Sequence, residues 1–200
     1  VKPFKTYEDL LIFLQDEKNL IIENMDTARH ILLKTSYFSL ISGYKDIFKN
    51  PTTGNYIDGT TFEDIYRLYQ FDNELRSIFL KYMLIAERSV KSSLAYHFSD
   101  TYGEDQKEYL STSHYMLTSS TKKGVQKLIG IFNYQLSHKS DHAYIDHYKT
   151  KHHNVPLWIM VQVLPIGQLS HMFDYLKAAV PIKVCNDFGH VGRKDMHSFL

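Results

Sequence analysis

Cysteine is almost missing from this chain of 200 residues, with Cys185 as its single example. One thiol cannot form an intramolecular disulfide, and it excludes the cysteine-rich zinc sites of many small domains. No apolar run reaches the roughly 20 residues that a membrane-spanning helix needs. The N-terminus also lacks the charged-then-apolar pattern of a signal peptide. We therefore expect a soluble cytoplasmic protein with no membrane partner.

Neither sign of charge dominates. Lys and Arg number 23 against 22 Asp and Glu, which gives a net charge of +1. The chain is thus not a generally basic nucleic-acid binder, and RNA binding would need a local patch. The glycine-rich phosphate loops, nucleophile elbows and paired carboxylates of ATPases, dehydrogenases and hydrolases do not occur. We expect no cofactor and no metal.

Apolar residues and aromatics are plentiful, and they follow helical periodicity. The composition is 44% hydrophobic and 22% charged, with 15 Tyr and 12 Phe, which is typical of a globular protein with a substantial core. Tyrosine suits both cores and interfaces, because its ring can be buried while its hydroxyl stays hydrogen-bonded. Nothing in the pattern demands a β-sheet. The sequence predicts an all-α fold in a single domain over residues 1–200.

The clearest element is one long central helix that ends at about Phe98. Thr61 is its expected N-cap, with Asp64 as the acid of a capping box. Between Ile78 and Ala86 only Lys81 is polar, so we expect protein to cover these turns on most sides. Three acid-before-base pairs at i,i+4 should support the helix. They are Glu63/Arg67, Asp72/Arg76 and Glu87/Lys91.

Shorter helices are expected on both sides of it. Thr6 and Asp26 are the predicted N-caps of two early helices, and Gly43 is the predicted stop of the second. Later helices are predicted over 121–138, over 140–152 and from Pro156 as a first helical residue.

The segment Phe62–Arg76 resembles the signature of the Abi-like proteins, the AbiD/AbiF group of bacterial abortive-infection factors. Three other segments match in the family's order: Lys2–Tyr7, Tyr37–Tyr44 and His147–Ser170. In the second of these, Phe38 and Ser39 replace a Tyr and an Arg of the family pattern. We expect structural roles for the residues that carry the resemblance, which are Tyr37, Gly43, Tyr44, Tyr69, Phe71, Asp72, Arg76, Trp158 and Gly167. Trp158 is the expected core anchor.

The resemblance implies a HEPN-like multi-helix bundle, since Abi-like proteins are similar to the HEPN superfamily of metal-independent ribonucleases. It implies RNA cleavage by attack of the 2′-OH, with an Arg/His motif completed across a homodimer interface. This sequence has no Arg-Asn…His segment. We expect that motif beyond Leu200, unless this member lacks it, so residues 1–200 should be inactive alone. Arg193 and His197 are weak candidates, because their spacing is one residue short, and we expect ordinary surface residues.

Three cations could contact RNA. Lys81, Arg88 and Lys91 fall within an arc of roughly 80° on a helix, which could form a basic stripe for phosphates. The partner would be a small antitoxin or guide-like RNA. The alternative is a solvated face beside Glu87. Asp72 and Arg76 could likewise contact RNA, but an intrahelical ion pair is the simpler interpretation.

Histidines gather late in the chain: His138, His142, His147, His152 and His153. The first two are spaced i,i+4, which on a helix can place two imidazoles on one metal. No Glu stands between them as in HExxH, so we expect solvated side chains.

Two functions follow from this sequence. The first is a phage-defence protein of the HEPN ribonuclease type. The second is a non-catalytic RNA- or protein-binding module of a defence or toxin–antitoxin system. A purely structural adaptor would bind no RNA at any salt concentration.

Overall fold

The computed structural model describes residues 3–189 and 191–199, with side chains described as far as Met196. Within these residues the chain forms eleven α-helices and no strand, so the predicted all-α fold with one long helix is confirmed. The helices are α1 (Tyr7–Asp16), α2 (Met25–Thr35), α3 (Gly43–Phe48), α4 (Phe62–Tyr102), α5 (Gln106–Leu110), α6 (Lys122–Ser137), α7 (Ala143–His147), α8 (Leu157–Met160), α9 (Ile166–Tyr175), α10 (Ala179–Asp187) and α11 (Arg193–Phe199).

The chain divides into two compact units, Val1–Lys81 and Tyr82–Leu200. Helix α4 belongs to the first unit up to Lys81 and to the second from Tyr82 onwards. Each unit has a hydrophobic core of its own. That the whole chain acts as a single domain stays a prediction.

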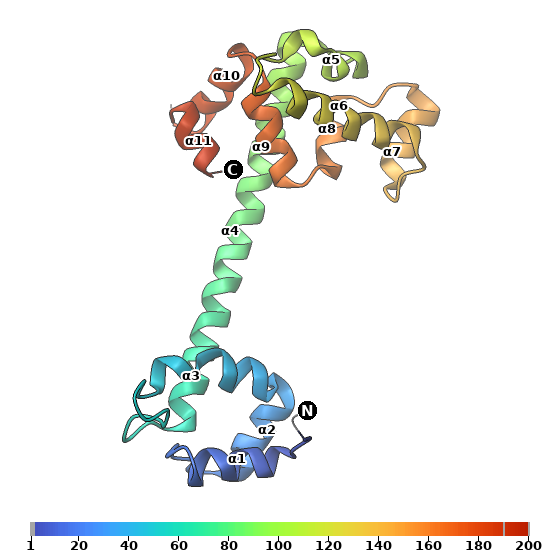
Figure 1. Ribbon diagram of the computed structural model, residues 1–200. Helices are drawn as coiled ribbons and strands as arrows, with labels where there is room; N and C mark the ends of the chain where they lie inside the picture. The colour runs from blue at the N-terminus through green and yellow to red at the C-terminus, as the bar shows by residue number, and fades with distance from the viewer. Residues whose placement is uncertain (1–2, 190, 200) are drawn as a thin grey trace. The chain divides into compact units, whose positions relative to one another are not determined.

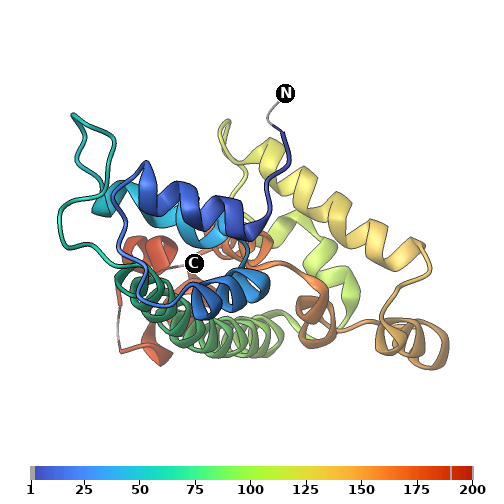
Figure 2. The ribbon, with the colours of Figure 1, turned by 90° about the horizontal axis from the view of Figure 1, so that it is seen from below.

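In the first unit, α1 lies against α2 beside the start of α4 (Figures 1 and 2). The predicted capping box of α1 is present, since Thr6 and Asp9 bond each other's backbone amides. Leu11 and Leu14 are three residues apart, so they share one helical face and are both buried. Leu32, Phe62 and Ile65, among others, complete this core.

Two expectations for this unit need correction. The N-cap of α2 is Asn24, whose side chain accepts a hydrogen bond from the Thr27 amide, and Asp26 lies inside the helix. Gly43 does not end a helix, because its φ of −71° is ordinary helical geometry. The chain passes through a π-helical turn at Phe38–Ser42 directly into α3.

Helix α4 begins where the sequence predicts. Thr61 Oγ1 accepts a hydrogen bond from the Asp64 amide, and the Asp64 carboxylate accepts from the amide and hydroxyl of Thr61. These bonds hold the pKa of Asp64 below its usual value. Two of the predicted i,i+4 pairs form, whereas the described residues show no ion pair between Glu63 and Arg67. The helix ends at Tyr102, before Gly103 with its φ of +99°.

The middle turns of α4 are exposed, contrary to the expectation that protein covers them. The residues Ile78, Phe79, Leu80, Tyr82, Met83, Leu84 and Ile85 expose between 41% and 65% of their surface. The reason is that the buried residues of α4 lie near its two ends: Phe62 and Ile65 early, and Val90, Leu94, Ala95 and Phe98 late.

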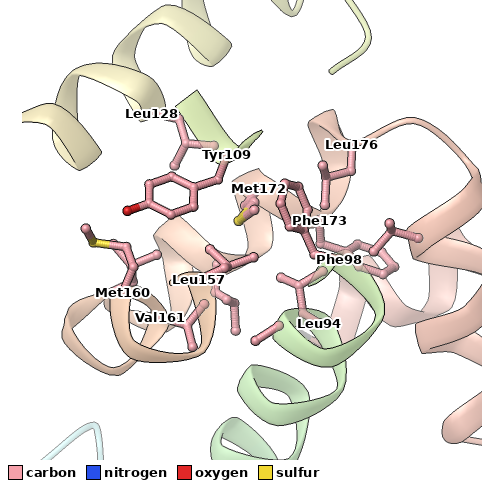
Figure 3. Close-up of a cluster of buried hydrophobic side chains, with 14 of the residues drawn as sticks. Leu94, Phe98, Tyr109, Leu128, Leu157, Met160, Val161, Met172, Phe173 and Leu176 are labelled. Atoms are coloured by element: carbon pink, nitrogen blue, oxygen red, sulfur yellow. The ribbon is translucent and has the colours of Figure 1, made fainter. Parts of the chain in front are cut away.

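The core of the second unit brings together side chains from most of its helices (Figure 3). Leu94 and Phe98 of α4 meet residues from α6, α8 and α9. Two buried tyrosines complete it with polar bonds: Tyr109 donates to the Val155 carbonyl at 2.8 Å, and Tyr115 donates to the Tyr109 carbonyl at 2.7 Å. Burial raises the pKa of both phenols, so they remain neutral donors.

Helices α6 and α9 approach closely at Gly124. A Cβ built there would lie 2.2 Å from Tyr175 Oη and 2.5 Å from Cζ, far inside van der Waals contact. Gly130 lies on the same helix with nothing within 4 Å of such a Cβ.

We therefore expect Gly124→Ala to lower the free energy of unfolding by about 1–3 kcal/mol, because the Tyr175 ring must move out of its packing. Gly130→Ala is the matched control and should stabilise by about 0.5–1 kcal/mol through helix propensity. Urea denaturation of both variants measures the difference. Equal effects would show that the contact at Gly124 does not constrain the packing.

Candidate functional site

Several residues of the family resemblance meet in the first unit. Tyr44 Oη donates a hydrogen bond to the Asp72 carboxylate, and Arg76 pairs with the same carboxylate. Arg76 also donates to Tyr44 Oη at 3.2 Å and to Asn73 Oδ1 at 3.0 Å. The bond to Asp72, followed by burial, raises the pKa of Tyr44. These residues line an open hollow of about 420 Å³ together with Ser39, Gly43 and Tyr69.

This network ties α3 to α4. Tyr44 comes from α3, Asp72 and Arg76 come from α4, and the Tyr44 ring packs edge-to-face on Tyr69 with centroids 5.9 Å apart. Because Asp72 neutralises the charge of Arg76, the network is better suited to holding α3 against α4 than to binding an anion. Tyr37 packs against the core nearby, while Phe71 is 60% exposed.

The three cations of the expected basic stripe differ from one another. Lys91 is 8% exposed, and its Nζ lies 2.7 Å from Glu87 Oε1. It is therefore a buried member of an ion pair. Lys81 and Arg88 are exposed. RNA binding by the stripe stays a prediction.

Arg88 begins a polar face of α4 within the second unit. Arg88, Ser92 and Tyr96 are spaced i, i+4 and i+8, so they stack along one side of the helix. With Ser89 and Ser93 they line a hollow of about 790 Å³, closed on one side by Asp187 and Phe188 of the α10 end. A second hollow of about 450 Å³ shares Ser92 and Tyr96 and continues to Lys91, Trp158 and Gln162, among others.

Two aromatic rings stand exposed on this surface. Tyr96 is 67% exposed and Trp158 is 41% exposed. For Trp158 this corrects the expected core anchor. Helix α8 is a single turn in which Leu157 and Met160 take the core positions, so Trp158 between them faces outward. We call Arg88, Ser92, Tyr96, Trp158 and Gln162 the α4 polar surface.

Asp187 is held by two side chains of α4. Its Oδ2 accepts from Ser93 Oγ at 2.6 Å and lies 2.9 Å from His97 Nε2. The Ser93 bond, and then His97, lower the pKa of Asp187. His97 Nδ1 is buried without a hydrogen-bond partner among the described residues. This is no nucleophilic triad, because the serine donates to the carboxylate and not to the imidazole.

The weak catalytic candidates lie on α11. Arg193 Nη2 donates to three backbone carbonyls at the end of α9, those of Phe173, Asp174 and Leu176, at 2.6–3.0 Å. Its guanidinium therefore satisfies the orphan acceptors of a helix C-terminus. The side chain of His197 lies outside the described residues. Gly167 is an ordinary residue of α9 with open space around it.

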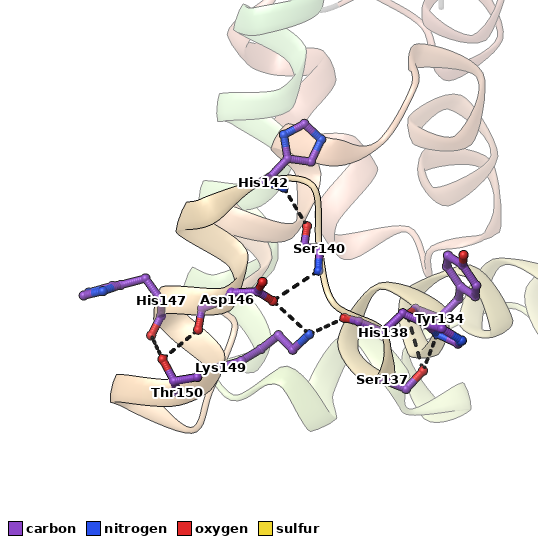
Figure 4. Close-up of polar contacts among 9 residues, drawn as sticks. All are labelled: Tyr134, Ser137, His138, Ser140, His142, Asp146, His147, Lys149 and Thr150. Atoms are coloured by element: carbon purple, nitrogen blue, oxygen red, sulfur yellow. Dashed lines mark hydrogen bonds and ion pairs between the residues drawn. The ribbon is translucent and has the colours of Figure 1, made fainter.

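The histidine cluster is divided by a loop (Figure 4). Helix α6 ends at Ser137, with His138 as its C-cap, and His142 is the N-cap of α7. The two imidazoles thus do not share a helix, so their i,i+4 spacing does not place them on one helical face. Asp146 instead accepts from the Ser140 amide and from Lys149, and these bonds lower its pKa. Across the described residues, no three His, Cys, Asp or Glu side chains are placed to hold a metal ion.

Sequence reasoning found Arg88 but missed Tyr96, Ser92 and Asp187. A signal was present for two of them, because Arg88, Ser92 and Tyr96 repeat at four-residue spacing within the predicted helix. Asp187 lies about 90 residues away in sequence, so only the fold brings it to His97.

The fold places the chain, as a class, among the all-α proteins with one long helix. The chain belongs to the Abi-like protein family, whose model matches residues 30–200. This confirms the resemblance to the Abi-like proteins over residues 30–200, whereas the Lys2–Tyr7 segment lies outside the match. The family supports a role in abortive-infection phage defence. Neither the curated proteins nor the solved structures gave a significant match. In the part of the chain that the structure describes, no helix is long and apolar enough to cross a membrane.

The network in the first unit predicts a measurable stability effect. Tyr44→Phe should lower the free energy of unfolding by about 1 kcal/mol, because Asp72 and Arg76 lose a shared hydrogen-bond partner. Tyr66→Phe is the control, since the Tyr66 ring stacks on Tyr69 while the hydrogen bonds of the network join Tyr44, Asp72 and Arg76 without it. Urea denaturation followed by circular dichroism compares them. If both variants lost the same stability, the network would not support the contact of α3 with α4.

Proposed function

We propose that this protein acts in phage defence by binding single-stranded RNA on the α4 polar surface. The observation that carries the proposal is the meeting of one exposed guanidinium, at Arg88, with two exposed rings, at Tyr96 and Trp158, on adjoining hollows. Membership of the Abi-like family gives the biological setting.

Each group suits a different part of an unpaired nucleotide. Aromatic faces stack on bases of any sequence, which is the usual way that proteins hold single strands. Arg88 can neutralise a phosphate and release its counterion. The hydroxyls of Ser89 and Ser92 and the amide of Gln162 can bond the ribose 2′-OH or base edges. With one guanidinium and few other cations, the surface favours a short segment of RNA over a long duplex.

The finer part of the proposal is that the whole protein is a HEPN-type ribonuclease of the AbiD/AbiF group. Such a site needs a general acid/base and a cation beside the scissile phosphate. Arg193, the candidate for that cation, instead donates to backbone carbonyls. We place the catalytic Arg and His outside residues 1–200, where attack by the 2′-OH would proceed across a homodimer.

The second candidate is a non-catalytic RNA-binding module that holds a small antitoxin or guide-like RNA. The same engagement of Arg193 favours it, because the α11 segment then completes the C-terminal end of α9 and does no chemistry. The two candidates share the RNA surface and differ in whether cleavage follows.

The RNA surface is tested by three variants. Tyr96→Ala and Trp158→Ala should each weaken binding of single-stranded RNA by about five- to a hundredfold, since each removes a stacking platform. Arg88→Gln should lower the slope of log affinity against log salt by about one. Tyr134→Ala removes another exposed tyrosine, 58% exposed on α6, and should bind like the parent protein.

Fluorescence anisotropy at several salt concentrations gives both quantities, and thermal unfolding shows that each variant is folded. Equal weakening in Tyr134→Ala would place binding elsewhere. Absence of RNA binding at every salt concentration would leave a protein–protein adaptor.

Cleavage is tested by incubating single-stranded RNA in EDTA with residues 1–200 and with the full-length protein. We expect no cleavage by residues 1–200. Cleavage by the full-length protein alone supports the HEPN-type site, whereas binding without cleavage by either supports the non-catalytic module. Cleavage by residues 1–200 that is lost in His197→Ala would overturn the placement of the catalytic pair.

A further inference from the structure

A carboxylate borders the hollow that Arg88 and Tyr96 line. Asp187 is the last residue of α10, and its Oδ2 accepts hydrogen bonds from Ser93 Oγ at 2.6 Å and from His97 Nε2 at 2.9 Å. Its side chain is nevertheless 46% exposed. A negative charge repels the phosphates of a nucleic acid. Asp187 is therefore better suited to a part of the nucleotide that carries hydrogen-bond donors.

The carboxylate lies beside the aromatic platform of the hollow. The rings of Tyr96 and His97 meet edge-to-face with centroids 5.2 Å apart, and His97 in turn bonds Asp187. Arg88 Nε instead donates to the Leu84 carbonyl at 3.2 Å, one turn nearer the start of α4. Tyr96 follows Arg88 by eight residues, about 12 Å along the helix. The hollow thus has its cation towards one end and its carboxylate beside the ring at the other.

We propose that this hollow binds an unpaired guanine in preference to the other bases, with the base stacked on Tyr96 and its Watson–Crick edge bonded to Asp187. Arg88 then lies on the side of the sugar–phosphate backbone. The inference rests on the proposed binding of RNA and names the base that the surface prefers.

The preference follows from the donors that each base presents. An ionised carboxylate can only accept hydrogen bonds. Guanine offers it two adjacent donors, N1–H and the N2 amino group. Adenine and cytosine place a ring nitrogen acceptor beside their amino group, and uracil holds its one N–H between two carbonyl oxygens. Those acceptors repel a carboxylate, so guanine is the base that suits it best.

The contacts of Asp187 prepare it for this role. The bond from Ser93, and then that from His97, hold the pKa of Asp187 below its usual value, so the group is ionised at neutral pH. A hydrogen bond to an ionised acceptor is stronger than one between neutral groups. Oδ2 already accepts two bonds, and a carboxylate offers about four lone-pair sites. Oδ1 is therefore the atom that would accept the donors of guanine.

The base preference is tested with single-stranded oligouridines of about eight nucleotides, a length within the usual site sizes for single strands. One central position carries guanosine, adenosine, cytidine, uridine or inosine, which lacks the N2 amino group of guanosine. The guanosine oligonucleotide should bind about fivefold or more tightly than those with the other three standard bases. Inosine should lose part of that advantage. Fluorescence anisotropy measures the five affinities.

Two variants assign the preference to Asp187. Asp187→Asn keeps the shape and an acceptor for Ser93 and His97 but loses the charge, so the five affinities should fall within about twofold of one another. Lys183→Gln is the matched control, because Lys183 bonds Asp100 at 2.7 Å and so joins α10 to the same helix by another ion pair. It should keep the preference for guanosine. The readout is a ratio of affinities, which a uniform change in binding does not alter.

Each contrary result has a distinct meaning. A preference for guanosine that survives in Asp187→Asn, or that disappears equally in Lys183→Gln, would overturn the role of Asp187. Equal affinities in the parent protein would overturn the base preference and leave the RNA surface intact. If none of the oligonucleotides bound at any salt concentration, the RNA surface itself would be overturned together with this inference.

Discussion

The structure depends on the continuity of α4. This 41-residue helix supplies Phe62 and Ile65 to one hydrophobic core and Val90, Leu94 and Phe98 to another. Helices in proteins gain most of their stability from packing an apolar face, because helix propensity alone is weak. The packed ends therefore hold the helix, and its N-terminus is closed by the bonds between Thr61 and Asp64. Its middle turns rely on local pairs and on the ladder of backbone hydrogen bonds.

Local rules predicted the local features of α4. The capping box, two of the three ion pairs and the helical state follow from spacing within a few residues, and spacing is visible in the sequence. The burial of each turn was not predictable in the same way. An all-apolar stretch such as Ile78–Ala86 indicates that something should cover it, but not whether that cover comes from the same chain. Likewise, the prediction that Gly43 ends a helix was wrong. Glycine can adopt either a positive φ or a helical φ, and Gly43 has a helical φ.

The same distinction between local spacing and burial applies to the candidate site. Arg88 and Lys91 looked equivalent in sequence, since both lie on one arc of a helix. The fold separates them, because Lys91 is buried against Glu87 while Arg88 borders an open hollow. The outward position of Trp158 follows from a single-turn helix whose other apolar residues already fill the core. Neither outcome could be read from periodicity, because both depend on which neighbours arrive from distant segments. Tyr96 could have been predicted from its four-residue spacing, whereas Asp187 could not, because it lies 90 residues from His97 in the sequence.

Within the second unit, the exposed side of α4 follows from a simple spacing. Steps of four residues place Arg88, Ser92 and Tyr96 along one side of the helix. Their polar groups can remain solvated until a charged or aromatic ligand replaces the water. Ile85 lines the same hollow as Arg88, so an apolar side chain borders these polar groups. The hollow therefore offers a cation, hydroxyls and an aromatic ring beside one another, which is the combination on which the proposal of RNA binding depends.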